Sequence, residues 1–289
     1  ADEQYVLWYV IKHEAVWHVD GVLLEKEKVN LSYNANAPAG TWSNMPDGSQ
    51  YAVGATATVS SKVPTRNGYT FDGWNTKENG RGTQYSGNDT FEITENTTLY
   101  AQWTQKESVK LTYIATEGGT VNRGSENVLP ATGVAKGSTA QPKPGYRFVN
   151  WTLGNTDTVV SSEAVLNQTA IDQYAKAGGV YVATTFTAHF GRDPQQVAAV
   201  SYEFTYNKSG HNVEIPDAIK QAPTDDETYY VGDTVKVKDP GTPDQVEDAA
   251  NGGYWTLGSV WTLNEDPYAA GSTVIVTAEN RQSLKFVAV

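Results

Sequence analysis

Hydrophobic and polar positions alternate with a period of two in several stretches, which is the pattern of strands that bury one face. In residues 29–33 the alternation puts Val29, Leu31 and Tyr33 on one face. Residues 109–113 repeat this opening, and residues 200–204 begin a third alternating run. The pattern therefore predicts three opening strands, each at the start of its own strand-rich unit.

An aromatic segment recurs along the chain. Residues 68–74 read Gly-Tyr-Thr-Phe-Asp-Gly-Trp, and residues 145–151 read Gly-Tyr-Arg-Phe-Val-Asn-Trp. A second segment, Thr-Leu-Tyr-Ala-Gln-Trp at residues 98–103, returns in degraded form as Phe-Thr-Ala-His-Phe at residues 186–190. A spacing of about 80 residues exceeds the roughly 20 to 50 residues of a solenoid unit. The recurrence therefore predicts a string of small domains.

The resulting prediction is a β-rich α+β chain built as a tandem array of small modules. A β-hairpin over residues 1–27 precedes modules over residues 28–104, 105–191 and 197–289. The hairpin, with aromatic pairs from Trp8, Tyr9 and Trp17, either completes the next sheet or is the remnant of an upstream domain. We favour the remnant. Cores of this size leave no room for a large catalytic cavity.

The alternation breaks within the aromatic segment. Tyr69, Phe71 and Gly73 share a face, which leaves Trp74 on the opposite face unless the backbone bulges. Glycine tolerates a bulge, so we place one at Gly73. By the same alternation the aromatic side chains at positions 146 and 148 point inward.

Helices are expected at two places only. Residues 161–179 form an insertion in which Ser162 can cap a helix and Gly178 can close it; the helix would carry Val165, Leu166, Ala170, Ile171 and Tyr174. A short helix is expected over residues 216–221, because proline suits a first helical position. Residues 229–237, 253–263, 272–278 and 283–289 are expected as strands, and residues 239–251 as a polar, acidic loop.

Composition narrows the classes of function. With 17 Tyr, 8 Trp and 7 Phe the chain favours strands, and with no Cys it has neither disulfides nor a cysteine nucleophile. Its 21 Lys and Arg against 33 Asp and Glu disfavour a nucleic-acid partner. No run of 18 apolar residues is present, so we expect no membrane insertion. The abrupt start and the apolar final strand suggest a segment excised from a longer protein, and we expect this segment to be monomeric.

No constellation of catalytic or metal-binding residues stands out, and no cofactor is expected. The four histidines, His13, His18, His189 and His211, are scattered over separate modules. The acidic clusters at residues 225–227 and 239–248 lack EF-hand spacing, so a solvated loop is preferred over a calcium site. The glycine-rich segment at residues 79–82 leads to a strand and is interpreted as a turn, not a phosphate loop.

A crosslink from a lysine to Asn or Asp is a further possibility in a chain without disulfides. It requires an apolar site and a nearby carboxylic acid. The lysines in strand patterns, Lys110, Lys236, Lys238 and Lys285, are expected on exposed faces, which argues against one.

Exposed aromatic side chains are the one plausible platform for a ligand, because they can stack on sugar rings or anchor a protein partner. The aromatic residues considered are Trp42, Trp74, Tyr85, Tyr229, Tyr230, Tyr254, Trp255 and Trp261. Most are expected in cores. Trp42, Tyr85 and Trp255 are retained as candidate ligand-binding residues, with a host glycan or host protein as the candidate partner.

The aromatic segment, the loop with Thr-Gln-Tyr at residues 83–85 and the strand at residues 97–103 resemble an internalin-type B-repeat, also called a Listeria-Bacteroides repeat. Residues 108–190 resemble a divergent member that ends in His-Phe instead of Gln-Trp. The third module, with Tyr-Val-Gly-Asp-Thr-Val at 230–235 and Gly-Tyr-Trp-Thr-Leu at 253–257, is similar to the SHIRT domain of streptococcal surface proteins.

These resemblances imply β-grasp-like or mixed-sheet modules in an extracellular bacterial surface protein, anchored in a Gram-positive cell wall. They imply a non-catalytic stalk or spacer that projects a binding region. A glycan- or host-protein-binding module is the alternative, and an accessory region of a secreted enzyme is the second.

Overall fold

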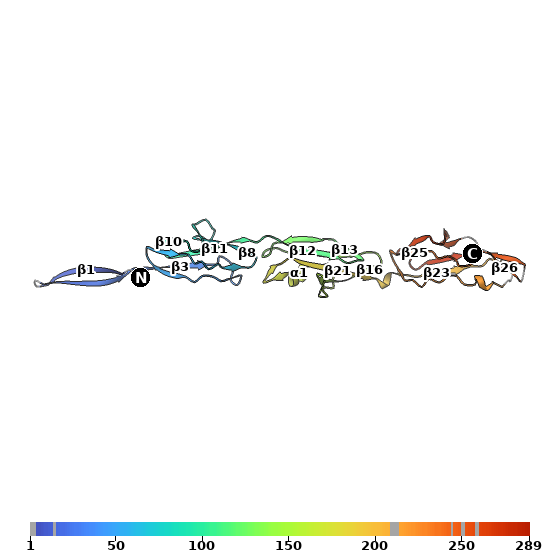
Figure 1. The fold of residues 1–289 in the computed structure, drawn as a ribbon, viewed down its shortest axis with the longest axis horizontal. Coiled ribbons are helices and arrows are strands. Elements are labelled where there is room, and N and C mark those ends of the chain that lie inside the picture. Colours follow the sequence, from blue (N-terminus) through green and yellow to red (C-terminus); the bar gives the residue numbers. More distant parts are fainter. Residues whose placement is uncertain (1–3, 14–15, 209–213, 244, 250–251, 258–259) are drawn as a thin grey trace. The chain divides into compact units, whose positions relative to one another are not determined.

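The computed structural model describes residues 4–13, 16–208, 214–243, 245–249, 252–257 and 260–289, and side chains are described only after residue 25. The chain forms two compact units, which are treated separately. One comprises Ala1–Leu111, Glu126–Ala135 and Ala175–Ala183; the other comprises Thr112–Ser125, Lys136–Tyr174 and Thr184–Val289. Strands dominate throughout and are grouped in small separate sheets, which confirms the predicted fold class (Figure 1).

The N-terminal hairpin is present. Strand β1 (Gln4–His13) pairs antiparallel with β2 (Val16–Glu25) in a two-stranded sheet of its own. The register places Trp8 opposite Gly21 and Trp17 opposite Lys12, so these aromatic residues do not face one another directly across the ladder. The hairpin's side chains, including those of His13 and His18, lie outside the described residues, as does His211. Its origin as a domain remnant stays a prediction.

A five-stranded sheet forms the core of the first unit, in the order β5-β3-β11-β8-β9. Strand β3 runs parallel to β11, and β11 pairs antiparallel with β8. Val29 and Leu31 are buried and Tyr33 is half-buried, as the alternation predicts. The strands are β3 (Lys28–Asn34), β5 (Ser49–Ala52), β8 (Tyr69–Asn75), β9 (Gln84–Tyr85) and β11 (Thr97–Gln105).

Smaller ladders complete the two repeats. In the first unit they are β4 (Trp42–Ser43) with β7 (Thr65–Arg66), β6 (Ala55–Thr58) with β10 (Thr90–Ile93), and β19 (Lys176–Ala177) with β20 (Val180–Tyr181). In the second unit β13 (Gly119–Val121), β15 (Ser138–Pro142) and β18 (Val165–Leu166) form a three-stranded sheet. Strand β14 covers Ser125–Val128.

The predicted bulge is present in the first repeat and recurs in the second. On β8, Gly73 faces Gln102 and Phe71 faces Trp103, which leaves Asp72 as the extra residue. On β16, Phe148 faces Phe190 and Asn150 faces His189, which leaves Val149 extra at the equivalent position. One extra residue reverses which side chains face inward. Both tryptophans at the end of the segment are therefore fully buried.

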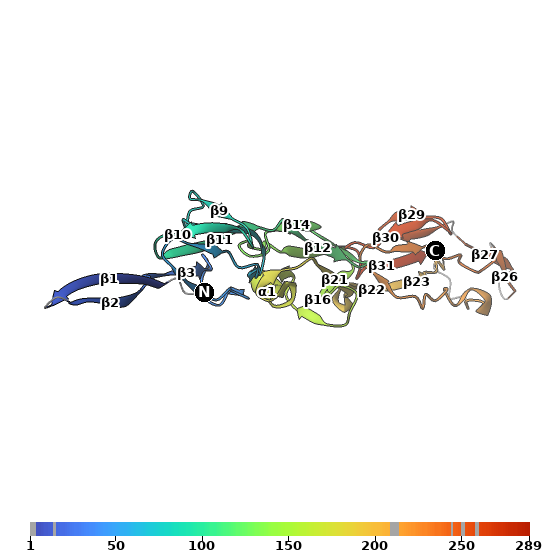
Figure 2. The same cartoon turned by 60° about the vertical axis from the view of Figure 1, so that its left-hand side comes forward.

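The helical insertion is shorter than predicted. Helix α1 covers Gln168–Ala175 and lies beside β21 in both ribbon views (Figures 1 and 2). Its cap is Asn167, whose side chain accepts from the backbone N–H of Ala170 at 3.1 Å, so Ser162 as the cap was wrong. Val165 and Leu166 are not helical, because β18 pairs them with β15. The residues expected in the first turn of the helix are therefore extended, because they pair with β15.

The third module, part of the second unit, is built from short strands. The main ones are β23 (Val200–Phe204), β28 (Trp261–Leu263), β29 (Asp266–Tyr268) and β31 (Leu284–Ala288). Three antiparallel pairs accompany them. β22 (Val197–Ala198) pairs with β24 (Tyr229–Tyr230), β25 (Thr234–Lys236) pairs with β30 (Thr273–Ile275), and β26 (Gln245–Asp248) pairs with β27 (Gly253–Thr256). Two 3-10 turns cover Pro194–Gln196 and Asp217–Ile219.

Two expectations for this module need correction. The loop expected over residues 239–251 contains a strand, β26, because its alternating Gln245, Val246, Glu247 and Asp248 pair with β27. The helix expected over residues 216–221 is a single 3-10 turn that Pro216 precedes. Both corrections concern short polar segments in which local propensity is weak.

All three modules share one strand order. The third sheet runs β23-β31-β28-β29, which matches β3-β11-β8-β9 in the first repeat; in the second repeat β12 (Val109–Ala115), β21 (Thr184–Arg192), β16 (Tyr146–Leu153) and β17 (Val159–Ser161) follow the same order. As β3 does with β11, β23 runs parallel to β31.

Behind each sheet, a tyrosine of the opening strand packs edge-on against a buried tryptophan. The ring centroids are 4.7 Å apart for Tyr33 and Trp74, 6.3 Å for Tyr113 and Trp151, and 5.0 Å for Tyr202 and Trp261. Edge-to-face geometry is the favourable arrangement of aromatic rings. Trp261 therefore occupies in the third module the position that Trp74 and Trp151 occupy in the two repeats.

We predict that Trp261→Ala lowers the free energy of unfolding of the third module by about 3 to 5 kcal/mol, because it removes a fully buried ring from the core. Urea denaturation followed by near-UV circular dichroism measures this. Trp42→Ala, at a ring that is 38% exposed, is the control and should change stability by no more than about 0.5 kcal/mol. Equal losses in the two variants would contradict the assignment of Trp261 to the core.

Candidate functional site

Trp42 lies in β4, which pairs with β7 so that Trp42 faces Arg66. Its side chain is 38% exposed and lies on a strand of two residues. This exposure makes Trp42 available to a partner. Its role in binding stays a prediction.

Tyr85 belongs to the core of the first repeat. It is half-buried in β9, opposite Trp74, and its ring lies 4.9 Å from that of Phe91. It packs against the buried cluster that contains Trp74 and Leu99. The structure thus gives Tyr85 a packing role, and its ligand role also stays a prediction.

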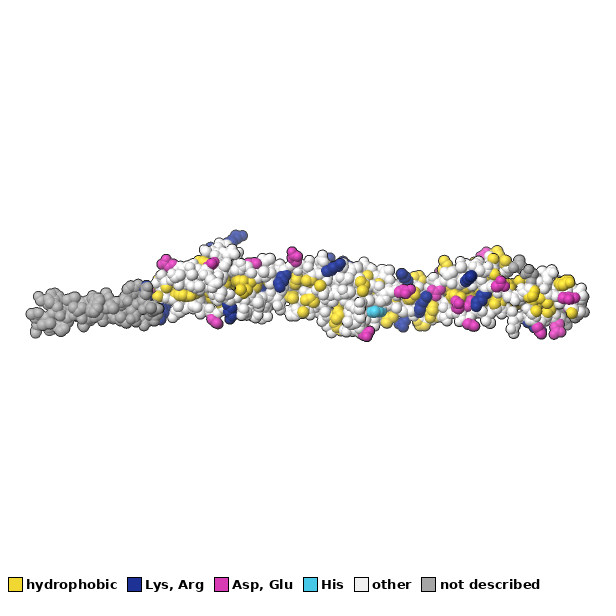
Figure 3. Space-filling model, in the orientation of Figure 1, with side chains coloured by type: hydrophobic (Ala, Val, Ile, Leu, Met, Phe, Trp, Pro, Cys, Tyr) yellow, Lys and Arg dark blue, Asp and Glu magenta, His cyan; other side chains and the backbone are white. Residues whose placement is uncertain are grey.

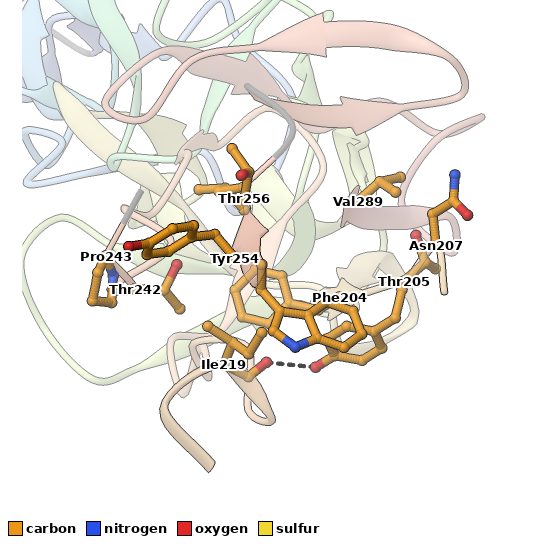
Figure 4. Close-up of a pocket in the computed structure, with 12 residues that line it drawn as sticks. Phe204, Thr205, Asn207, Ile219, Thr242, Pro243, Tyr254, Thr256 and Val289 are labelled. Atoms are coloured by element: carbon orange, nitrogen blue, oxygen red, sulfur yellow. Dashed lines mark hydrogen bonds between the residues drawn. The ribbon is translucent and has the colours of Figure 1, made fainter. Parts of the chain in front are cut away.

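Trp255 lines a cavity of about 280 Å³ in the third module (Figure 4). The residues that line it are Phe204, Thr205, Tyr206, Asn207, Ile219, Thr242, Pro243, Tyr254, Trp255, Thr256, Leu257 and Val289. They come from the end of β23 and the residues after it, from the 3-10 turn that contains Ile219, from the segment just before β26, from β27 and the residue after it, and from Val289 after β31. The cavity is therefore rich in aromatic rings and hydroxyl groups, and no charged side chain is among its lining residues.

Two buried polar atoms of this cavity lack hydrogen-bond partners among the described residues: Trp255 Nε1 and Thr242 Oγ1. Three other indole groups are paired. Trp103 donates to Ala35 O at 2.8 Å, Trp151 to Ala164 O at 3.2 Å and Trp261 to Lys238 O at 2.8 Å. An unpaired buried donor is destabilising by about 1 to 3 kcal/mol, so such atoms deserve a functional explanation.

The acidic cluster at residues 225–227 is not a wholly solvated loop. The Asp225 side chain is fully buried, and the Lys238 ammonium lies 3.5 Å from its carboxylate and donates to Thr224 O at 2.8 Å. Tyr229 donates to Glu227 at 2.9 Å; burial and this bond raise the pKa of the Tyr229 hydroxyl. Lys238 is therefore half-buried and paired, whereas Lys110, Lys236 and Lys285 are exposed as expected.

Within the part of the chain that the structure describes, no three His, Cys, Asp or Glu side chains come together to hold a metal ion. His189 instead shares a hydrogen bond of 2.9 Å with the Thr152 hydroxyl. On the face drawn in Figure 3, Lys and Arg side chains are interspersed with Asp and Glu and gather over no single element. No described helix has the length and apolar character needed to cross a membrane.

In the first unit, the turn before the aromatic strand contacts segments that belong to the second repeat. Gly68 adopts φ +77°, and a Cβ placed there would lie 2.8 Å from Ala131 Cβ. The Asn67 side chain donates to Gly178 O at 2.8 Å, which reinforces the contact. Gln105, at the end of β11, donates to the Thr132 hydroxyl at 2.6 Å.

In the second unit, the equivalent turn makes the equivalent contact with the third module. Gly145 also adopts φ +77°, and a Cβ there would lie 2.3 Å from Val231 O. Its backbone N–H donates to Gln196 Oε1 at 3.0 Å. The same glycine of the repeated segment therefore lies against the following module in both units.

Arg192 strengthens the contact in the second unit. Its guanidinium lies 4.5 Å from the Tyr146 ring and 4.9 Å from the Tyr230 ring, and Nη1 is 2.9 Å from the Asp233 carboxylate. The Arg192 side chain is 40% exposed, so the ion pair is screened by solvent, and the stacking on two rings adds to it. Arginine thus links one ring from each side of the contact.

The segment between these modules is ordered by local hydrogen bonds. The Asp193 carboxylate accepts from the Gln195 backbone N–H at 3.0 Å and from the Gln196 side chain at 2.8 Å. The bond from the Gln195 backbone, followed by that from Gln196, lowers the pKa of the Asp193 carboxyl. This polar segment is therefore a capped turn, and it positions the Gln196 side chain to accept from the Gly145 backbone N–H.

The sequence pattern pointed to some of these residues and missed others. The recurrence of Gly-Tyr-x-Phe marked both turns, but it indicated a core strand and not a contact between modules. Nothing in the sequence pattern marked Arg192 as a contact residue, because a single arginine at a module boundary is not a distinctive feature. The cavity around Trp255 could not be located, because its walls come from segments far apart in the chain.

Comparisons with known protein families agree with the repeats. Residues 30–102 match the family model of the Listeria-Bacteroides repeat domain, and residues 109–192 match that of the divergent InlB B-repeat domain. The chain thus contains two B-repeat domains in tandem, of a kind found in bacterial surface and extracellular proteins and not known as catalytic domains. The similarity of the third module to SHIRT domains stays a prediction.

Two curated proteins of Evansella cellulosilytica are similar over short stretches. One, named as a membrane protein, is 46% identical over 57 residues, which are 19% of this chain and 8% of that protein. The other, named as a Gly-rich membrane protein, is 56% identical over 39 residues, which are 13% of this chain and 4% of that protein. The matched part thus spans less than a tenth of either relative.

We predict that Gly145→Ala destabilises the second unit more than Gly40→Ala destabilises the first. Both glycines have similar positive φ values, +77° and +80°, so the backbone strain of about 1 to 2 kcal/mol is common to both. Only at Gly145 would the added Cβ meet another atom, Val231 O, since nothing lies within 4 Å of Gly40. Urea denaturation of both variants tests this, and equal losses would argue against a tight contact at Gly145.

We predict that the contribution of the Asp193 cap depends on pH. Since its pKa is lower in the folded state, the stabilisation is complete above the unfolded value of 3.8 and is lost as the pH falls through the lowered value. The difference in urea stability between the wild type and Asp193→Asn should therefore shrink below about pH 4. A difference that stays constant from pH 7 to pH 3 would contradict this.

Proposed function

We propose that this chain is a non-catalytic spacer segment of a bacterial cell-surface adhesin, which projects a binding region from a Gram-positive cell wall. The observation that carries the proposal is the repeated contact made by the turn glycines, Gly68 and Gly145, with the module that follows each in sequence. A stalk requires that successive modules resist bending. Contacts that recur at the same position of a repeat are suited to this task.

The composition of these contacts supports the proposal. In the second unit they combine a backbone approach at Gly145, the side-chain bond from Gln196 and the stacking of Arg192 on Tyr146 and Tyr230. Close packing of backbone permits few relative orientations, because interfaces at native density deform little. The two B-repeat matches support a surface location for the same chain.

We predict that Arg192→Ala loosens the contact between the second repeat and the third module. The chain has no Cys, so Glu163→Cys and Lys236→Cys, at exposed positions in the two modules, provide unique sites for dyes. Single-molecule energy transfer should show a narrow distribution of efficiencies in the otherwise unaltered chain. Arg192→Ala should broaden it, because the link between the two tyrosine rings is lost.

Arg81→Ala, at an exposed loop position of the first repeat, is the matched control and should leave the distribution unchanged. A broad distribution in the chain that retains Arg192 would overturn the spacer proposal, since a freely hinged chain does not hold a binding region at a fixed distance.

A further inference from the structure

We propose that the cavity lined by Trp255 is a binding site for a neutral saccharide ring. This inference does not depend on the spacer role, because the cavity belongs wholly to the third module and shares no residue with the contact around Gly145 and Arg192. It rests on three features: flat aromatic faces, unpaired polar atoms and the lack of charge in the lining.

The aromatic faces come mainly from the hairpin of β26 and β27. Tyr254 is 68% exposed, more than any other large hydrophobic side chain among the described residues. Its neighbour Trp255 stands edge-on to Tyr206, with ring centroids 6.2 Å apart and an interplanar angle of 89°. The Tyr206 hydroxyl is already engaged, since it donates to Ile219 O at 2.5 Å (Figure 4). Tyr206 therefore forms a wall of the cavity that its hydrogen bond fixes, and Trp255 contributes an aromatic ring whose Nε1–H has no partner among the described residues.

The unpaired atoms define what the occupant must offer. Trp255 Nε1 can only donate a hydrogen bond, whereas Thr242 Oγ1 can donate and accept. A hydroxyl group can satisfy either atom, because it can accept from the indole and can donate to or accept from the threonine, and a sugar carries several hydroxyl groups. An aliphatic peptide side chain would fill the cavity but would leave both atoms unpaired, which binding sites avoid.

The part of the lining that the structure describes offers no opposite charge to a charged ligand. Its polar residues are Thr205, Asn207, Thr242 and Thr256 with the two tyrosines, and none carries a charge at neutral pH. A phosphate or an ammonium group would lose its hydration without gaining an opposite charge. A neutral molecule with apolar ring faces and hydroxyl edges matches the lining, and this is the chemistry of a sugar.

The proposal requires a small shift of the hairpin of β26 and β27, because the Trp255 indole N–H is shielded from solvent in the free protein. β26 and β27 form a two-stranded sheet that joins none of the described strands of the main sheet. The buried residues Trp261 and Phe286 lie outside this hairpin, on β28 and β31.

The test uses the whole chain with cellotriose, maltotriose and N-acetyllactosamine as probes, followed by saturation-transfer NMR and by tryptophan fluorescence. We expect at least one probe to bind with a dissociation constant of about 1 mM or lower. Trp255→Phe retains an aromatic ring but removes the N–H, so it should weaken that binding about tenfold. Thr242→Val should weaken it in the same direction.

Trp255→Phe also gives a readout in the absence of ligand. Since it removes an unpaired buried donor, the free variant should melt at a temperature no lower than the parent chain, which separates weaker binding from misfolding. Ile275→Ala, at a position of β30 that is 62% exposed and lies outside the lining, is the control and should leave binding unchanged. Failure of all three sugars at 10 mM, equal binding by Trp255→Phe, or binding of a proline-rich peptide in place of the sugars would each overturn the proposal.

Discussion

The structure depends on one constraint: in the first repeat and the third module, the first and last strands of the main sheet lie side by side in parallel, with a Tyr–Trp pair packed behind them. Parallel neighbours cannot be joined by a tight turn, so the rest of the module must run out and return between them. The returning strand carries the buried tryptophan, Trp74 in the first repeat and Trp261 in the third module. Strand order, aromatic core and turn positions follow from this arrangement.

The bulge on the aromatic strand makes that core possible. Without an extra residue, the tryptophan would lie on the opposite face from the phenylalanine three positions before it. Asp72 and Val149 are the extra residues, and their side chains are exposed although one is acidic and the other apolar. The position tolerates such different residues because the extra residue is left out of the regular pairing and only its presence is required.

The repeated turn connects the core to the proposed mechanical role. The glycine that precedes the aromatic strand has a positive φ value in both repeats. Because glycine has no side chain, another module can approach the backbone closely at this position. The bulge and the Tyr–Trp pair fix the position of the aromatic strand, and the turn that precedes this strand is fixed with it. The lining of the cavity in the third module includes none of the residues of the contact around Gly145 and Arg192, so a ligand site and a rigid contact can coexist in one module without sharing residues.

The amino-acid sequence by itself determined the strand-rich class, the opening strands and the bulge, because alternation and the recurrence of Gly-Tyr-x-Phe are local properties of the chain. It misplaced the start of α1 and missed β26, since pairing with distant strands overrides weak local preferences. Only the tertiary structure decided that Trp261 takes the place of Trp74, that Arg192 links two tyrosine rings and that Trp255 has an unused donor. Each of these depends on residues that are distant in the chain and meet only when it folds.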